Sequence, residues 1–341
     1  NRTAYLDLLV ENKPVLKHLV ELVSQSSWIA DRLTEHPILM DELLYPKSLY
    51  QPLKIVDLKN ELRQSLLRIE DDEEVLLNSI RQFKQINELR VASALLIRQL
   101  NISEVGEYLT ELAEVIIESS VTQCWKSVTE KYGTPENLTA VKDYGFAIIG
   151  YGKLGGTELG FNSDLDLVFL FDQSIDSNTN GQKPVSSTRF YTRLSQKLIH
   201  FLSTRTSQGV LYEVDMRLRP SGNSGMLVSH IDTFGNYQRE EAWTWEHQAL
   251  IRARCVFSGS ETLSNQFSKL RNELINKERN KRDLSKDVVS MRDKMRKQLD
   301  QSKDDCFDLK QGVGGLVDVE FLAQFFTLNN ESKSDSEVPS N

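Results

Sequence analysis

Two aspartates, Asp164 and Asp166, stand at the start of a stretch, Leu165 to Phe171, that is otherwise apolar. Such a stretch predicts a buried β-strand, and side chains alternate between the faces of a strand, so both carboxylates should point the same way. Two like charges side by side are unfavourable unless a cation lies between them, and Mg²⁺ with oxygen ligands is the usual solution. Taken alone, the pair is equally compatible with an exposed strand end that carries two solvated acids.

A glycine-rich segment, residues 150–156, lies just upstream, after the short apolar strand predicted at Phe146 to Gly150. Glycines permit close approach of the backbone to a ligand, and amides exposed at a helix start favour phosphate. The segment has neither the Walker nor the Rossmann spacing, and a tight strand-to-helix connection is the simpler alternative. The candidate nucleotide contacts from this region are Lys153, Gly155, Gly156 and Ser163.

A third acidic position, Asp215, lies in a stretch from Val210 to Arg219 that alternates with period two until Pro220. The pattern predicts a strand with four charged side chains on one face: Glu213, Asp215, Arg217 and Arg219. A structural ladder of ion pairs is one interpretation. Beside a metal-bound triphosphate, Asp215 would instead complete the metal ligands, and Arg217 or Arg219 would offset polyphosphate charge.

The three aspartates, Asp164, Asp166 and Asp215, are therefore the candidate catalytic and metal-binding residues. Two Mg²⁺ ions held there would activate an attacking hydroxyl and orient a triphosphate. Asp164 and Asp166 would bridge both ions, and Asp215 would bind only the catalytic one.

The surrounding pattern indicates which elements position these residues. Helical periodicity extends to about Tyr132, and the order strand, helical turn, strand, helix, strand follows it. Beyond Ser229 helical patterns resume, with a long helix expected from Glu278 to Gln301. The expected fold class is α+β, a mixed sheet with helices, flanked by all-helical regions. The expected domains are a helical region 1–135, a catalytic core 136–260, a helical region 261–328 and a polar tail or linker 329–341.

Composition narrows the class of protein. With 341 residues, 39% of them hydrophobic and 26% charged, the chain is expected to be globular with more than one domain. A net charge of -8 argues against binding nucleic acid, because such binding depends on Lys and Arg. Three cysteines without CxxC pairs suggest neither a disulfide framework nor a zinc cluster. No signal peptide or membrane-length apolar stretch is evident, so a cytoplasmic location is expected, and the absence of an initiator Met suggests a fragment.

The glycine pair, the Asp-x-Asp strand and the later lone Asp together resemble the signature of the polymerase-beta-like nucleotidyltransferase fold. More specifically, the sequence resembles the glutamine synthetase adenylyltransferase family over nearly its whole length. The segments that carry this resemblance are residues 150–160, 163–167, 215–222, 241–250 and 314–321.

The resemblance implies a function. Family enzymes have two similar halves, one that removes AMP by phosphorolysis and one that attaches AMP from ATP. The segments Trp243–His247 and Pro220–Gly222 look like the C-terminal, attaching half. By resemblance, the acceptor is a tyrosine of glutamine synthetase, pyrophosphate is released, and glutamine and the PII signalling protein act as effectors. His247, Trp243 and Trp245 could position adenine or the protein substrate, although core packing explains the tryptophans at least as well. Asp318 and Glu320 could bind an effector, but acids at the start of a helix are the simpler interpretation.

Three other functions remain open. One is the deadenylylating half of the same enzyme, and another is a non-catalytic scaffold that binds PII. A nucleotidyltransferase that acts on a small molecule fits the three aspartates equally well, but not the later segments.

Overall fold

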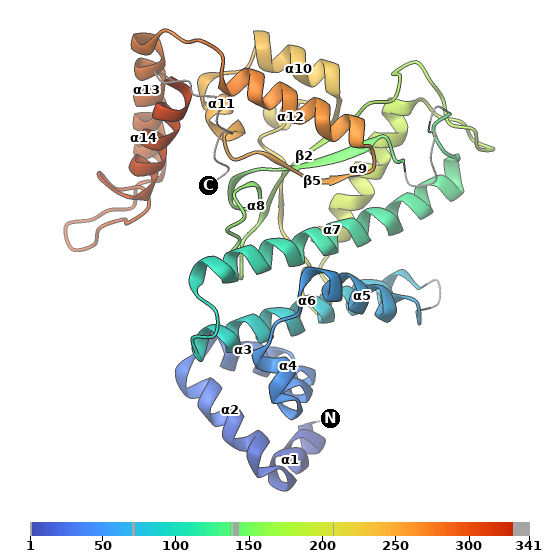
Figure 1. The fold of residues 1–341 in the computed structure, drawn as a ribbon, viewed down its shortest axis with the longest axis vertical. Helices are drawn as coiled ribbons and strands as arrows, with labels where there is room; N and C mark the ends of the chain where they lie inside the picture. Colours follow the sequence, from blue (N-terminus) through green and yellow to red (C-terminus); the bar gives the residue numbers. More distant parts are fainter. Residues whose placement is uncertain (1, 70–71, 137, 139–142, 207, 330–341) are drawn as a thin grey trace. The chain divides into compact units, whose positions relative to one another are not determined.

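The computed structural model describes residues 2–69, 72–136, 138, 143–206 and 208–329 (Figure 1). The chain forms two compact units. The first comprises Asn1–Ser127, Thr157–Asp164 and Gln196–Val214, and the second comprises Val128–Gly156, Leu165–Ser195 and Asp215–Asn341. The domain boundaries expected from sequence stay a prediction, and nearly all of the expected polar tail lies outside the described residues.

The first unit is helical, as its sequence pattern predicts. Its helices are α1 (Arg2–Glu11), α2 (Lys13–Gln25), α3 (Ser27–Glu35), η1 (Pro37–Leu44), α4 (Pro46–Tyr50), α5 (Ile55–Leu66), α6 (Glu73–Leu96) and most of α7 (Ile102–Tyr132). Asp72 caps α6 by accepting hydrogen bonds from the amides of Glu74, at 2.9 Å, and Val75, at 3.2 Å. The core that holds the helices together consists of buried apolar side chains, among them Leu22, Ile29, Leu33, Leu43 and Leu89.

A mixed sheet of five strands is formed almost entirely by the second unit. The strands are β1 (Phe146–Gly150), β2 (Leu165–Phe171), β3 (Val214–Asp215), β4 (Val228–His230) and β5 (Arg254–Ser258), in the order β3-β2-β1-β5 with β4 also paired to β2. β1 is antiparallel to β2, and Gly150 is opposite Leu167. The glycine-rich segment that leaves β1 therefore begins beside the start of β2.

Helices cover both faces of this sheet. The remaining elements are α8 (Gly152–Gly155), α9 (Ser187–Ser203), η2 (Gly222–Ser224), α10 (Ile231–Glu240), α11 (Thr244–Leu250), α12 (Glu261–Ile275), α13 (Lys281–Leu299) and α14 (Leu316–Asn329). On one face, Ile149 and Val168 share a core with Phe234 of α10 and Phe267 of α12. On the other face, Tyr191 of α9 stacks on the rings of Phe146 and Phe171. Burial on both faces explains the continuous apolar stretches of β1 and β2 and confirms the α+β class.

Two predicted elements differ from the structure. The strand expected from Val210 to Arg219 is only the two residues of β3, because the Asp215 carboxylate accepts the amide of Arg217 at 2.8 Å and starts a turn. The expectation of helix beyond Ser229 is wrong at β5, whose five residues are all half-buried and carry little periodic signal. The long helix expected at 278–301 is confirmed as α13, capped by Asn280.

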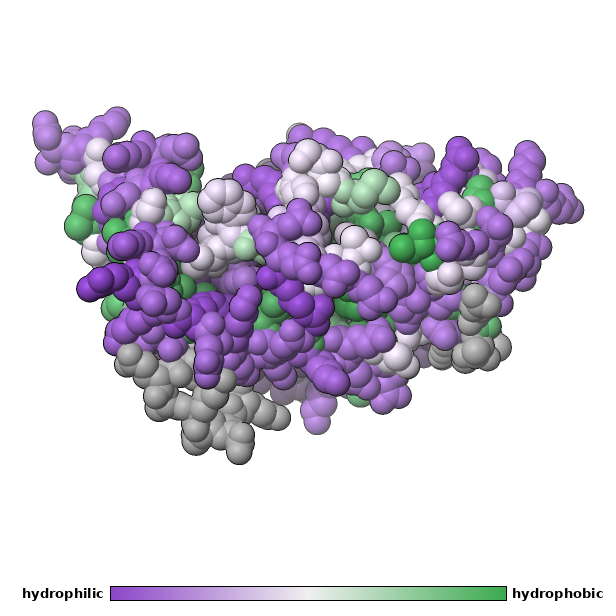
Figure 2. All heavy atoms as spheres, turned by 90° about the horizontal axis from the view of Figure 1, so that it is seen from above, coloured by the Kyte–Doolittle hydropathy of each residue, from purple (hydrophilic) through white to green (hydrophobic). Residues whose placement is uncertain are grey.

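The surface is dominated by polar residues on the face that Figure 2 shows, where hydrophobic side chains are scattered in small groups. None of the helices in the described part combines the length and the apolarity that crossing a membrane requires.

Candidate metal centre

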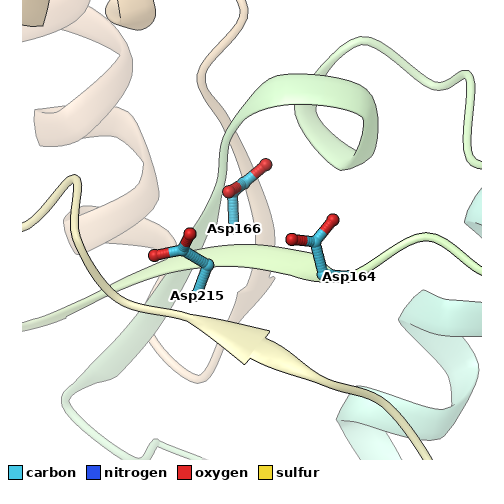
Figure 3. A group of neighbouring side chains, drawn as sticks. All are labelled: Asp164, Asp166 and Asp215. Atoms are coloured by element: carbon cyan, nitrogen blue, oxygen red, sulfur yellow. The ribbon is translucent and has the colours of Figure 1, made fainter. Parts of the chain in front are cut away.

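Three carboxylates gather at one edge of β2 and β3. Asp164 immediately precedes β2, Asp166 lies within it, and Asp215 ends β3; one oxygen from each lies within 4.8 Å of the others. Figure 3 shows all three side chains turned toward a common space. No second group of three or more His, Cys, Asp or Glu side chains with this spacing occurs among the described residues.

Strand geometry explains this convergence. Leu165 and Leu167 are completely buried, so alternation along β2 directs Asp164 and Asp166 away from the core on that side. Asp166 is half-buried and Asp164 is exposed. β3 is the neighbour of β2 in the sheet, and it brings Asp215 to the same place. The structure therefore brings together the three aspartates expected from sequence, and their role as metal ligands stays a prediction.

The donor set fits a hard divalent cation. All three groups offer carboxylate oxygen, and Mg²⁺ prefers oxygen to nitrogen or sulfur ligands. Without a cation, three carboxylates this close repel one another. The three residues that would hold a metal ion are thus of the right chemistry for Mg²⁺.

Arg217 stabilises the charged form of Asp215. Its Nε donates to Asp215 Oδ2 at 2.7 Å, its Nη2 contacts the same oxygen, and its amide donates to Oδ1. These hydrogen bonds hold the pKa of Asp215 below its usual value, against the opposing effect of burial. The Arg217 side chain is itself largely exposed. A carboxylate that stays charged is a better metal ligand than one that binds a proton.

Glycines make room around Asp166. Gly152 has a φ of +54°, and a Cβ there would lie closer than 3.0 Å to Asp166 Oδ2. A Cβ on Gly155 would overlap the carbonyl oxygen of Arg252 and lie 2.6 Å from that of Gly150. From the sequence, these glycines were expected to let a ligand approach the backbone. The sequence did not predict that Gly152 leaves room for the Asp166 carboxylate of the candidate centre.

Three other residues expected to contact a nucleotide have different surroundings. Lys153 is exposed on α8 and has no ion-pair partner among the described residues. A Cβ on Gly156 would meet the Arg252 guanidinium at 2.5 Å. The Ser163 hydroxyl accepts the amide of Gly160 at 2.9 Å, which closes the turn before Asp164. For all three residues, contact with a nucleotide stays a prediction.

Arg219 has a visible structural role. It is almost buried, and its guanidinium donates to the carbonyl oxygens of Met216 at 2.7 Å, Asn223 at 3.1 Å and Gly225 at 3.4 Å. All three guanidinium nitrogens therefore hold the turn that follows β3. Of the two arginines expected near polyphosphate, Arg217 is the one with a largely exposed side chain.

Two arginines that the sequence reasoning missed lie against the glycine-rich segment. Arg254 of β5 donates to the carbonyl oxygens of Leu154, at 3.2 Å, and Gly155, at 3.4 Å. Arg252 pairs with Glu320 of α14 at 3.5 Å. Nothing in their spacing indicated this position, because β5 itself was not expected.

His247 and Asp318 each have hydrogen-bond or ion-pair partners within the fold. His247 is buried, and a ring nitrogen lies 2.8 Å from the carbonyl oxygen of Gln238; burial lowers its pKa. Asp318 contacts the guanidinium groups of Arg292, at 2.5 Å, and Arg296, at 2.9 Å. It also accepts the amide of Gly314, two residues before the start of α14, at 2.7 Å.

Residues 16–270 match a family described as glutamate-ammonia ligase adenylyltransferase. The chain is also similar to the bifunctional glutamine synthetase adenylyltransferase/adenylyl-removing enzyme of Shewanella loihica, with 50% identity over 335 residues. The aligned part covers 96% of this chain and 35% of the relative. The chain thus spans about a third of the length of the curated relative that it matches.

Proposed function

Because the chain belongs to the glutamate-ammonia ligase adenylyltransferase family, we propose that it carries the active site for transferring AMP from ATP to a tyrosine of glutamine synthetase, releasing pyrophosphate. The observation that supports this most directly is the convergence of Asp164, Asp166 and Asp215 within 4.8 Å. A cluster of three carboxylates suits nucleotidyl transfer, which depends on compensating and positioning the charges of a triphosphate.

Each part of the site has a proposed task. Asp164, Asp166 and Asp215 would hold two Mg²⁺ ions, which when bound lower the pKa of an attacking hydroxyl and offset charge on the leaving pyrophosphate. Arg217 stabilises the charged, metal-binding form of Asp215. The exposed Lys153 attracts the polyphosphate by its charge, and the glycine-rich backbone admits it closely.

The direction of the reaction is a further part of the proposal. The name of the Shewanella relative includes both attachment and removal of the adenylyl group. We assign attachment to this chain because its segments 220–222 and 243–247 resemble the attaching half. We also assign glutamine and the PII protein as effectors and the cytoplasm as location, because regulation of glutamine synthetase requires access to that enzyme.

The proposal is tested by incubating the protein with purified glutamine synthetase, labelled ATP and Mg²⁺. AMP should be incorporated covalently on tyrosine, and Asp164→Asn or Asp166→Asn should lower incorporation on the order of 10²-fold or more because transition-state charge loses its compensation. Asp176→Asn is a matched control, since Asp176 is exposed and outside the cluster. Wild-type rates in both cluster variants would show that the metal assignment is wrong.

Two further assays separate the alternatives. Adenylylated synthetase incubated with phosphate yields ADP if the chain performs removal, so little or no ADP is expected. A scaffold without catalytic function would show no rise in melting temperature with Mg²⁺ and a non-hydrolysable ATP, whereas a nucleotide-binding enzyme must show one.

A further inference from the structure

A polar cavity of about 550 Å³ lies within the first unit, apart from the carboxylate cluster. It is formed by the end of α3, the middle of α6 and residues 205–206 and 208–213. The side chains that determine its character are Arg32, Arg81, Lys84, Gln85, Glu88 and Arg205. None of the residues assigned above to metal or nucleotide lines it.

The unusual feature of this cavity is Arg81. Its residue is 1% exposed, and its Nη2 donates to the carbonyl oxygen of Thr204. Its Nε and Nη1 atoms are buried and have no hydrogen-bond partner among the described residues. Arg81 also has no ion-pair partner among these residues. A buried guanidinium without an opposite charge is unfavourable, because it has lost its hydration and gained little in return.

The other charges of the cavity do not compensate Arg81. Arg32 pairs with Glu35 at 3.4 Å, and Lys84 pairs with the buried Glu88 at 3.4 Å. Those two cations and two acids balance one another.

Two other groups at the cavity lack a partner, one for its charge and one for a hydrogen bond. Arg205 is exposed and has no ion-pair partner in the described part of the chain. The Oε1 of Gln85 is buried without a hydrogen-bond partner there, while its Nε2 donates to the carbonyl oxygen of Gln208 at 3.0 Å. Arg81 and Arg205 thus outnumber the remaining acid, Glu213, which is exposed.

We propose that this cavity binds a small molecule through a phosphate or carboxylate group, with Arg81 as the principal contact and Arg205 at the exposed side. An oxyanion supplies the opposite charge that Arg81 lacks and accepts its two unpartnered N–H groups. A hydroxyl on the ligand would donate to Gln85 Oε1. The site is independent of the proposed adenylyl transfer, because no residue is shared.

The test uses the whole chain in a chelator, without divalent ions, so that the carboxylate cluster does not recruit anions. Sodium phosphate and sodium acetate are titrated separately at constant ionic strength made up with chloride, and the melting temperature is recorded. Saturation by the preferred anion should raise it by about 2–4 °C. A response to phosphate alone, or to acetate alone, assigns the preferred oxyanion class.

Variants connect the response to the cavity. Arg81→Gln should abolish the shift, and Arg205→Ala should raise the apparent dissociation constant by about tenfold. Arg205 is exposed, so that variant decides the question even if Arg81→Gln does not fold. Arg68→Ala, at an exposed arginine away from the cavity, and Lys153→Ala, at the candidate nucleotide site, should keep the full shift.

The proposal is overturned if neither anion raises the melting temperature above the chloride control. It is also overturned if Arg205→Ala responds like the wild-type protein, because the anion then binds elsewhere.

Discussion

Replacing Gly152 by alanine tests whether the position of Asp166 controls the candidate centre. The φ of +54° costs an alanine about 1–2 kcal/mol. The added Cβ would also lie closer than 3.0 Å to Asp166 Oδ2, a separation that real contacts essentially never show, so the carboxylate must move by more than half an ångström. Catalytic groups need placement within about 0.5 Å, so we expect AMP transfer to fall about tenfold or more.

Gly314→Ala is the matched control. Gly314 also has a positive φ, +80°, but a Cβ there would meet nothing within 4 Å. Both variants should lose about 1–2 kcal/mol in urea unfolding followed by circular dichroism. Only Gly152→Ala should also lose activity and affinity for Mg²⁺, measured by labelled AMP incorporation and calorimetry. The reasoning is refuted if the two variants are equally active, since the displaced carboxylate would then have no effect on the reaction.

Four other predictions concern stability and reactivity. Asp318→Asn should lower the free energy of unfolding by about 2 kcal/mol at pH 7, because the nearly buried Arg292 loses its charged partner. The pKa of Asp318 is lowered in the folded state by the Gly314 amide and by Arg292 and Arg296. Its contribution to the free energy of unfolding is therefore present above the unfolded pKa and is lost as pH falls through the folded pKa. The urea midpoints of the variant and the wild type should converge in acid. Gly155→Ala should destabilise by about 3 kcal/mol or more, since backbone must move, and a melting temperature equal to that of wild type would contradict the overlap. Burial raises the pKa of the Cys124 thiol to about 12, so alkylation of the native protein should modify the exposed Cys306 first, as mass spectrometry of peptides can show. Asp72→Ala should cost about 1 kcal/mol through loss of the α6 cap, measured by urea unfolding against Asp176→Ala.

The sequence was most informative where charged residues interrupt stretches that are expected to form buried strands. β1 and β2 were predictable because few structures other than a buried strand place so many consecutive apolar residues together. Asp164 and Asp166 were identifiable because two charges interrupt such a strand at its start. Asp215 was identifiable as an acid within an alternating stretch, although the strand around it proved to be two residues long.

Other features depend on contacts between distant parts of the chain. The left-handed conformation of Gly152 and its closeness to Asp166 appear only once β1 and β2 are paired. Arg219 was expected near polyphosphate, but its neighbours are three carbonyl oxygens of its own turn. Arg81 occupies a helix in which a solvated arginine would have the same sequence signature, so its burial was not foreseeable.

The very short β3 has a consequence for folding. Asp164 and Asp166 are adjacent on one strand as soon as β2 forms, whereas Asp215 joins them from 49 positions beyond Asp166 and is held by a pairing of two residues. Closing that loop has an entropic cost that local structure does not repay. A partly folded chain would thus present two carboxylates, and only the native chain presents three. Affinity for a divalent ion is accordingly a measure of completed tertiary structure. As the protein is denatured, this affinity should disappear before the circular dichroism signal of the helices.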